Sequence, residues 1–476
     1  VPSIVYLKSD EQNLNEVVIS ASKFEQHRKE VPQKILSLKA EDILISNPQT
    51  SADLLQNSGQ VFVQKSQLGG GSPMIRGFAT NRLLLTIDGV RMNNAIFRGG
   101  NIQNVISIDP FSVQNSEVIL GAGSVIYGSD AIGGVMNFYT PSPKLSESGS
   151  LLIEGDVITR YSSASNEKAV HADINLGWSE WATHTGFSFT DFDDLTMGKY
   201  GPDDYLRPEY VETNNGMDEI IANSEPRKQR FTGYNQINFL QKVHYKPNAL
   251  TSFDLGLHYS ATSEYPRYDR LIRYNGDQLR SAEWNYGPQR WFLGNFQFSR
   301  YSSESKWFDN FKLTAAYQNL QESRSDRNFN SDLRRNREEQ VNAYSMNLDF
   351  EKWISDHSEI FYGVELIYNR IGSTGVEENV NSGLATPIAS RYPEGSSWSS
   401  VAAYLSYKYK PSQRFTLQSG MRYNHINIKA DLTENNDFFN FPFDNANLDT
   451  GAFSGTLGIS WLPNDIIQWK FNLTSA

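Results

Sequence analysis

Long stretches of the second two thirds of this chain alternate apolar and polar residues with a period of two. The alternation is clearest in residues 311–318, 401–409 and 415–424. A period of two places successive side chains on opposite faces of a β-strand, and runs of about 9 to 12 residues suit a strand that crosses a bilayer at a tilt. No apolar run approaches the roughly 20 residues of a membrane helix. The pattern predicts a membrane-spanning antiparallel sheet, with a soluble β-sandwich as the alternative.

Short and long connections alternate between the expected strands. The short ones lie at 179–180, 246–248, 303–305, 355–356, 411–413 and 463–465, and the long ones at 191–229, 264–288, 323–337, 371–398 and 429–450. Outer-membrane β-barrels have this arrangement, with the short turns facing the periplasm. Aromatic side chains beside the short turns predict an interfacial girdle: Trp178, Trp181, Tyr245, Trp353, Tyr409 and Trp461.

The first 143 residues have a different texture. The apolar run 83–87 ends in Asp88-Gly89, which predicts a strand followed by a tight turn. Residues 117–140 alternate glycine pairs with β-branched runs, and this favours a sharply turned sheet over a helix. Two short helices are expected, one starting at Ser37 as N-cap and one from Ser51 to a stop at Gly59. This part therefore predicts a small α+β domain.

Three motifs of this domain occur in the order and spacing of a known family. They are Ile75-Arg76-Gly77, Ile87-Asp88-Gly89-Val90, and Val125-Ile126-Tyr127-Gly128 with Ala131–Asn137. The domain resembles the plug of TonB-dependent outer-membrane transporters. The resemblance implies a mobile periplasmic segment with a TonB box in 1–25, a plug in 26–143 and an up-and-down β-barrel from 144 onward.

We count about thirteen barrel strands up to residue 476, whereas plugged barrels close with about 22. We therefore expect the sheet to remain open and the native protein to continue beyond Ala476. The expected fold class is a membrane β-barrel that contains a small α+β plug domain.

Glu16, Val17, Val18 and Ile19 form a β-branched patch with no partner strand nearby. A similar segment in the family is, or adjoins, the TonB box, which pairs as an added strand with the periplasmic energy-coupling protein TonB. Main-chain hydrogen bonds drive such β-augmentation. The resemblance predicts that this segment is mobile at rest and binds TonB, and the alternative is that it forms the first plug strand.

The family also implies a contact that seats the plug, in which a pair of plug arginines faces barrel glutamates. Arg76 matches the first position by its motif. Leu120 occupies the place where many members carry the second arginine. We therefore expect Arg76 to act in plug seating, and the alternative is that it is an ordinary solvated arginine.

Two regions are expected to bind ligand at the outward mouth. The plug loop 91–104 contains hydrogen-bonding, stacking and cationic groups, and Ile96 with Phe97 forms an apolar pair that needs a cover. Its candidate residues are Arg91, Asn93, Asn94, Phe97, Arg98 and Asn101. The loop 265–286 interleaves arginines with aromatic rings, and its candidates are Tyr265, Arg267, Arg270 and Arg273. Alternatively, the acidic loops 191–229 and 429–450 pair with loop arginines and only hold the mouth together.

The remaining chemistry argues against other classes of function. There is no nucleophile motif, no phosphate-binding loop and no histidine pair at ligand spacing, so we expect no catalytic residue, no metal site and no cofactor. Asp191–Asp194 is better explained as a solvated acidic loop than as a Ca²⁺ site. The chain lacks cysteine, and its net charge of -11 argues against nucleic-acid binding.

The resemblance implies active, TonB-dependent import of a scarce nutrient across the bacterial outer membrane, with the N-terminus in the periplasm. A ferric siderophore or haem is the expected ligand, and cobalamin, a carbohydrate or a peptide are alternatives. The expected partners are TonB and outer-membrane lipid, and a surface lipoprotein is left open. A surface adhesion or assembly protein without transport, built on the same fold, is the alternative of a different class.

Overall fold

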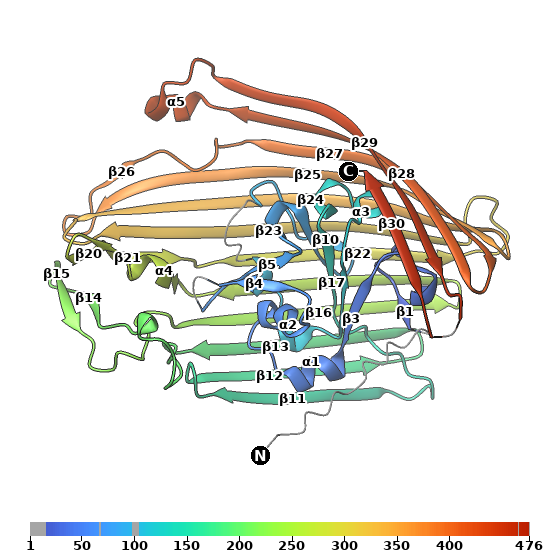
Figure 1. The fold of residues 1–476 in the computed structure, drawn as a ribbon, viewed down its shortest axis with the longest axis horizontal. Helices are drawn as coiled ribbons and strands as arrows, with labels where there is room; N and C mark the ends of the chain where they lie inside the picture. Colours follow the sequence, from blue (N-terminus) through green and yellow to red (C-terminus); the bar gives the residue numbers. More distant parts are fainter. Residues whose placement is uncertain (1–15, 66–67, 98–103, 465, 476) are drawn as a thin grey trace.

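The computed structural model describes residues 16–65, 68–97, 104–464 and 466–475. Figure 1 shows a large curved antiparallel sheet with a smaller domain, the plug, on its concave side. The N-terminal 139 residues contribute the plug strands, and the curved sheet begins at Leu152. The tertiary arrangement therefore agrees with the expected plug inside a β-barrel.

The main path of the curved sheet contains thirteen strands, each antiparallel to the next, as counted from the sequence. They are β11 (Leu152–Ser162), β12 (Glu167–Gly177), β13 (Trp181–Phe192), β16 (Tyr234–Asn248), β17 (Thr251–Thr262), β22 (Arg290–Tyr301), β23 (Asn310–Asn328), β24 (Leu333–Ser355), β25 (Ser358–Asn379), β27 (Ser397–Ser412), β28 (Phe415–Asp431), β29 (Asn445–Trp461) and β30 (Trp469–Ser475). Within the described chain β11 and β30 are the two edges, so the barrel is not closed.

The long-loop rim contains secondary structure of its own. Its elements are η6 (Asp203–Tyr205), β14 (Glu209–Asn214), β15 (Met217–Ala222), β18 (Tyr265–Pro266), α4 (Tyr268–Leu271), β19 (Tyr274–Asn275), β20 (Gln278–Leu279), β21 (Ser281–Tyr286), β26 (Ala385–Pro387) and α5 (Thr433–Phe439). The prediction of a long loop at 323–337 was wrong. Strands β23 and β24 continue through this region and leave only a four-residue turn between Asn328 and Leu333. Cross-strand pairing with the neighbouring hairpins keeps these strands extended beyond the alternating region.

The plug is built on a mixed five-stranded sheet in the order β3-β9-β10-β7-β8. Its strands are β3 (Ile35–Lys39), β7 (Leu83–Ile87), β8 (Val90–Arg91), β9 (Asn115–Ile119) and β10 (Gly134–Tyr139). Smaller elements surround it: β1 (Val17–Val18), β2 (Gln26–His27), η1 (Arg28–Glu30), α1 (Ala40–Ser46), α2 (Ser51–Asn57), β4 (Phe62–Gln64), β5 (Ser72–Ile75), β6 (Phe78–Ala79), η2 (Thr80–Arg82), η3 (Asn104–Ser107), η4 (Pro110–Ser112), α3 (Ser124–Tyr127) and η5 (Ser129–Ala131).

Local predictions for the plug are confirmed in part. Asp88 and Gly89 take φ values of 48° and 79° in the tight turn between β7 and β8, as predicted. Ser37 is not an N-cap, because it pairs with Glu117 inside the sheet and the helix begins only at Ala40. The interpretation of 117–140 as sheet alone was also wrong, since Ser124–Tyr127 form the short helix α3.

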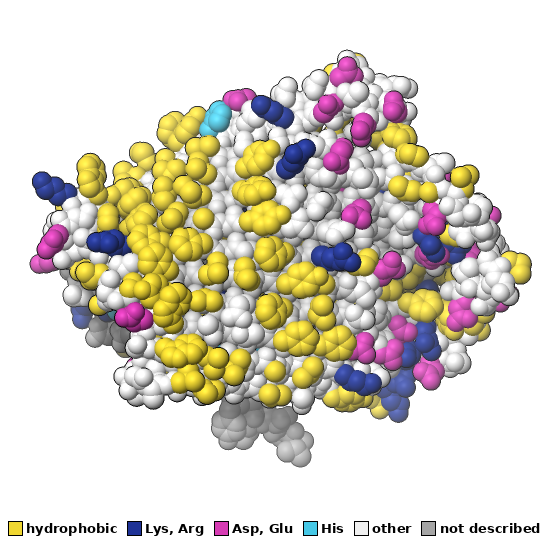
Figure 2. All heavy atoms as spheres, turned by 180° about the vertical axis from the view of Figure 1, so that it is seen from behind, with side chains coloured by type: hydrophobic (Ala, Val, Ile, Leu, Met, Phe, Trp, Pro, Cys, Tyr) yellow, Lys and Arg dark blue, Asp and Glu magenta, His cyan; other side chains and the backbone are white. Residues whose placement is uncertain are grey.

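The outer face of the curved sheet is apolar. Figure 2 shows hydrophobic side chains spread over this face, with charged side chains gathered mainly over the long-loop rim on the right. The girdle residues Trp178, Trp181 and Trp461 are 45%, 48% and 48% exposed beside the short turns, and Trp181 stacks on Tyr245. Among the described residues, no helix is long and apolar enough to span a bilayer.

Candidate functional site

The segment with the expected TonB-box sequence is packed in the interior, between plug and barrel wall. Val18 is fully buried, and Val17 and Val18 pair with His27 and Gln26. Strand pairing and burial place this part of the segment against the plug, and its mobility stays a prediction. Residues 1–15 lie outside the described part of the chain.

Two plug side chains hold this segment through its main chain. The Glu117 carboxylate accepts the backbone N–H groups of Ile19 at 3.2 Å and Ser20 at 2.8 Å, and the Tyr127 hydroxyl donates to the Ser20 carbonyl at 2.9 Å. Burial raises the pKa of Glu117 against the lowering effect of the N–H donors on Ser20 and Ile19. We call Glu117 and Tyr127 the clamp.

The seating contact is formed by other residues than expected. Arg91 of the plug donates to the Tyr127 carbonyl and to Asp130, and its guanidinium lies 3.6 Å from the Glu365 carboxylate on β25. Glu365 also pairs with Arg422 of β28 at 2.7 Å. Arg76 is exposed in the β5–β6 turn with a φ of 50°, and among the described residues it makes no ion pair. The assignment of plug seating to Arg76 is therefore not supported, and we call Arg91, Arg422 and Glu365 the seating cluster.

Arg422 supplies from the barrel the second arginine that Leu120 does not supply from the plug. It is 1% exposed and donates to the Ile126 carbonyl of α3 at 3.3 Å. Gly128 lies between the two guanidinium groups at a φ of 90°, and a Cβ there would be 3.2 Å from Arg422 and 3.4 Å from Arg91. Sequence inspection missed Glu365 and Arg422, although their inward position in the alternation was a usable signal.

Further carboxylates join plug and barrel. Glu30 pairs with Lys408 at 2.8 Å and also with Lys410. Burial by itself would raise the pKa of Glu30, but the two ammonium groups outweigh it and lower the pKa below its usual value.

Asp88 and Asp349 make two further ionic contacts between the domains. Asp88 of the plug pairs with Lys242 at 2.9 Å and lies 3.3 Å from His258, and Asp349 of the barrel pairs with Lys23 at 2.9 Å. Burial opposes ionisation of Asp88, but Lys242 and His258 hold its pKa well below the usual range.

The outward plug loop is tied to the barrel. Asn93 is buried and bonds the backbone of Leu83 and Leu85, while the Asn94 side chain accepts the Ile96 N–H. Ile96 is 4% exposed. It packs on barrel side chains: Val341, Ala343 and Ile371. The apolar pair was expected to need a cover from ligand or barrel, and barrel strands supply it for Ile96.

The other candidates in this loop differ in accessibility. Phe97 is half-buried against the main apolar cluster, and Arg91 points into the seating cluster. Arg98 and Asn101 lie outside the described residues.

The arginine-aromatic loop has two kinds of members. Tyr265 is 1% exposed and bonds Gln289, and Arg267 is held by Asp269 at 2.7 Å and the Tyr286 hydroxyl at 2.6 Å. These two side chains are occupied by contacts within the protein. Arg270 and Arg273 keep more exposed side chains, 34% and 47%, at 3.6 Å and 3.7 Å from Asp269. They remain accessible from the mouth.

One acidic loop does pair with arginines, as the alternative stated. Arg327 of β23 binds Asp218 of the 191–229 loop at 2.8 Å and Glu283 at 2.8 Å, and Arg334 shares Glu283. This network fastens the β14–β15 hairpin to the rim. Asp193 pairs with Lys228 at 3.2 Å, and no group of three metal-ligating side chains occurs among the described residues.

Two family descriptions match the chain: "TonB-dependent Receptor Plug Domain" over residues 27–135 and "TonB dependent receptor-like, beta-barrel" over residues 227–476. The chain is 30% identical over 284 residues to a vitamin B12 transporter BtuB of Vibrio vulnificus, which covers 59% of this chain and 43% of that protein. A vitamin B12 transporter BtuB of Photobacterium profundum is 31% identical over 142 residues, 29% of this chain and 23% of that protein. The chain thus spans less than half the length of these curated relatives.

Solved structures share the fold at low identity. The ferric yersiniabactin uptake receptor FyuA of Yersinia pestis superposes with a TM-score of 0.67 at 14% identity, over 94% of this chain and 65% of that one. The copper transporter OprC gives 0.67 at 14% identity, over 90% and 61%. Because the barrel description alone covers more than half of the chain, this is an integral outer-membrane protein that belongs to the family of TonB-dependent receptors.

Proposed function

We propose that this chain is the plug and first barrel part of a receptor that imports a nutrient across the outer membrane by drawing on TonB. The observation that carries the proposal is the clamped N-terminal segment. Val17 and Val18 form only two strand pairs, with β2, and two side chains hold the next two residues by their main chain. Such a segment can exchange its pairing for an added strand on another protein.

The proposed TonB contact comprises Glu16, Val17, Val18 and Ile19. In the resting state Glu16 pairs with Arg28 at 2.7 Å and Val18 is buried, so binding requires release of the segment. Val18→Pro removes a main-chain donor and should abolish capture of the complete receptor by the periplasmic domain of TonB. Val157→Pro, at an exposed apolar side chain of barrel strand β11, is the matched control. Undiminished capture of the Val18→Pro receptor would contradict the proposal.

The proposed ligand is a large metal complex, with a corrinoid as first candidate because the curated relatives are named vitamin B12 transporters. A ferric siderophore or haem is the second candidate, since FyuA is titled a ferric yersiniabactin receptor and HasR a hemophore receptor in complex with heme. We propose that Phe97, Arg270 and Arg273 contact the ligand, together with Arg98 and Asn101.

Uptake assays on a strain that lacks its own receptor would decide between the candidates. Cells that express the complete receptor should accumulate labelled cobalamin only when TonB is present, and ferric chelates and haem are offered in parallel. Arg270→Ala with Arg273→Ala should weaken ligand binding by about tenfold to a hundredfold, whereas Arg300→Ala near the short-turn rim should not. Surface binding without accumulation of any ligand would favour the adhesion alternative. Whether a surface lipoprotein takes part is tested by co-purification.

The family descriptions and the relatives are those of receptors and transporters rather than enzymes. The clamp and the seating cluster agree with such a role, because they hold side chains in place by ion pairs and main-chain hydrogen bonds. Neither arrangement pairs a nucleophile with a base, which hydrolytic chemistry would require.

A further inference from the structure

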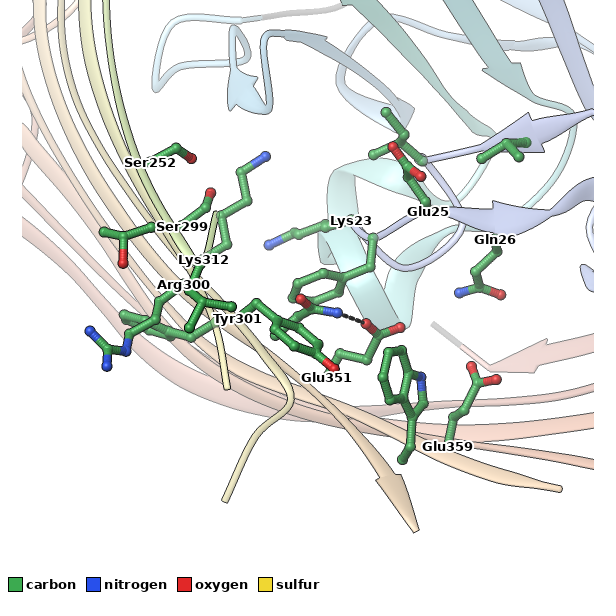
Figure 3. A pocket seen from close by; sticks show the side chains of 18 of the residues that line it. Lys23, Glu25, Gln26, Ser252, Ser299, Arg300, Tyr301, Lys312, Glu351 and Glu359 are labelled. Atoms are coloured by element: carbon green, nitrogen blue, oxygen red, sulfur yellow. Dashed lines mark hydrogen bonds between the residues drawn. The ribbon is translucent and has the colours of Figure 1, made fainter. Parts of the chain in front are cut away.

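Two adjoining cavities lie between the plug and the wall formed by β16, β17, β22, β23 and β24. One, of about 760 Å³, opens beside the short turns near Leu250, Tyr301 and Trp353. The other, of about 550 Å³, continues inward to Asp88 and Thr140. Both are lined by Ile19, Lys23 and Lys312. Figure 3 shows Lys23 reaching in from the plug and Lys312 from the barrel.

The Lys312 ammonium group does not pair with the carboxylate that the strand register places beside it. Its cross-strand partner on β24 is Asp349, and an inward Lys-Asp pair in this register would ordinarily form an ion pair. The Asp349 Oδ1 instead accepts from Lys23 at 2.9 Å and from the Tyr404 hydroxyl at 2.7 Å. Among the described residues, no carboxylate oxygen lies within ion-pair distance of Lys312, so a positive charge remains in the cavity.

The other lysines that line the inner cavity are in ion pairs, Lys23 with Asp349 among them. Lys242 pairs with Asp88 at 2.9 Å, and Asp254 is bonded by His244 at 2.6 Å. Lys39 lies 3.5 Å from Glu16. Lys312 is therefore the one lysine of this lining without an ion pair among the described residues, and an unpaired ammonium group in a confined space favours an anion beside it.

Asn295 is a second, independent group without a partner at this place. It lines the inner cavity from β22 and is 5% exposed, and its buried Oδ1 has no hydrogen-bond partner among the described residues. Gly256 on the adjacent strand leaves room for the Asn295 side chain, since a Cβ at position 256 would be 2.2 Å from the Asn295 Oδ1. A buried acceptor oxygen without a donor is characteristic of a site that receives a hydroxyl or N–H group from a ligand.

We propose that the inner cavity is a binding site for an anion that also carries a hydroxyl group, a hydrogen phosphate or a hydroxycarboxylate, whose anionic oxygen accepts from Lys312 and whose hydroxyl donates to the Asn295 Oδ1. The inference deepens the proposed function, because the site would receive an anionic part of the transported solute on the periplasmic side of the plug. A free phosphate presents the same chemistry.

The site depends on Lys23, which belongs to the N-terminal segment. While Lys23 holds Asp349, Lys312 is free to bind an anion. Removal of the segment frees Asp349 to pair with Lys312 across the strands, and this neutralises the site. Withdrawal of the segment by a periplasmic partner would therefore release the anion from the site.

The test uses the complete receptor in detergent, titrated calorimetrically with inorganic phosphate and separately with citrate. Lys312→Gln should weaken the binding of either anion by about tenfold or more. Lys429→Gln, which removes an exposed lysine from β28, should bind as the wild type does. Lys23→Gln should also weaken binding, although it leaves Lys312 in place. The double variant Lys23→Gln with Asp349→Asn should restore it, because no carboxylate is then left to neutralise Lys312.

Binding of phosphate but not citrate would identify phosphate chemistry, and the reverse would identify a carboxylate. Absence of binding to the wild type, equal binding by Lys312→Gln, or no recovery in the double variant would each overturn the inference. Failure is separable from failure of the proposed function, because TonB-dependent uptake and ligand binding at the outer mouth are measured on the same variants. Uptake without anion binding would contradict this site alone.

Discussion

Glu365 is the carboxylate on which the seating of the plug depends. It is 8% exposed at its side chain and faces Arg91 from the plug and Arg422 from the barrel. Two buried guanidinium groups, those of Arg91 and Arg422, share this carboxylate. If it is lost, Asp130 is the one other described carboxylate that pairs with either of them. Breaking a buried ion pair in this way costs about 3–5 kcal/mol.

Glu365→Gln should therefore loosen the plug. When urea unfolds the plug, the complete receptor should begin to conduct ions. We expect the variant to reach this point at a lower urea concentration, by an amount that corresponds to about 3–5 kcal/mol. Glu377→Gln on the same strand β25 is the matched control, since it lies at the outer end away from the cluster. Equal midpoints for the two variants would show that Glu365 does not seat the plug.

Glu30 gives the plug a pH-dependent contact. Its pKa in the folded protein is below the ordinary value of a glutamate, because Lys408 and Lys410 outweigh the effect of burial. A depressed carboxyl pKa contributes stability that is complete above the unfolded-state pKa and is lost as pH falls through the folded-state pKa.

We expect Glu30→Gln to release the plug at lower urea than the wild type at pH 7. The difference should shrink below about pH 4.5 and vanish once Glu30 is protonated in the folded wild type. Conductance measurements across this range check the sign. A difference that persists unchanged at low pH would mean that Glu30 acts through packing rather than charge.

At the scale of elements, the N-terminal segment, α3 and the seating cluster form one connected unit. The carbonyls of Ile126 and Tyr127 accept from Arg422 and Arg91, and the Tyr127 hydroxyl reaches Ser20. A shift of the outward loop that follows β8 would therefore reach the segment through Arg91 and α3. This contiguous path is a physical basis for coupling between the outer mouth and the periplasmic side.

Tyr127→Phe should open the clamp without a change of packing. The buried Ser20 carbonyl loses its donor, which costs about 1–2 kcal/mol and corresponds to roughly tenfold faster local opening. These 476 residues contain no cysteine, so Val18→Cys provides a single reporter whose maleimide labelling measures that opening. Tyr409→Phe in the outer girdle is the control. Labelling at an unchanged rate would contradict the role given to the Tyr127 hydroxyl.

At the scale of the whole molecule, membrane insertion depends on the apolar outer face. Leu405 on β27 points outward and is 46% exposed, whereas its neighbour Ser406 is buried toward the plug. Arginine on the lipid face of a barrel costs about 2–4 kcal/mol near the bilayer midplane.

Leu405→Arg should accordingly reduce the amount of folded receptor in the outer membrane. Leu384→Arg is the matched control, because Leu384 lies on the long-loop rim and is 68% exposed there. Heat-modifiable mobility of outer-membrane fractions reports folded protein. Equal yields of the two variants would argue that β27 does not face lipid.

The sequence by itself determined what depends on neighbouring residues along the chain. A period of two predicts strands and their two faces whatever they pack against, so the thirteen main strands, the girdle and the turn at Asp88 were all predictable. The plug motifs were recognisable for the same local reason. Local signals failed where pairing overrides them, as at Ser37 and in the loop predicted at 323–337.

Only the tertiary structure decided which inward polar groups meet. Arg91 rather than Arg76 faces the barrel carboxylate Glu365 because docking brings β8 against β25, a contact between residues 274 positions apart in the chain. The same docking covers Ile96 and buries Val18 of the N-terminal segment. It also pairs Asp349 with a plug lysine instead of Lys312. Such contacts depend on how one folded domain fits inside another, and no periodicity within either domain encodes that fit.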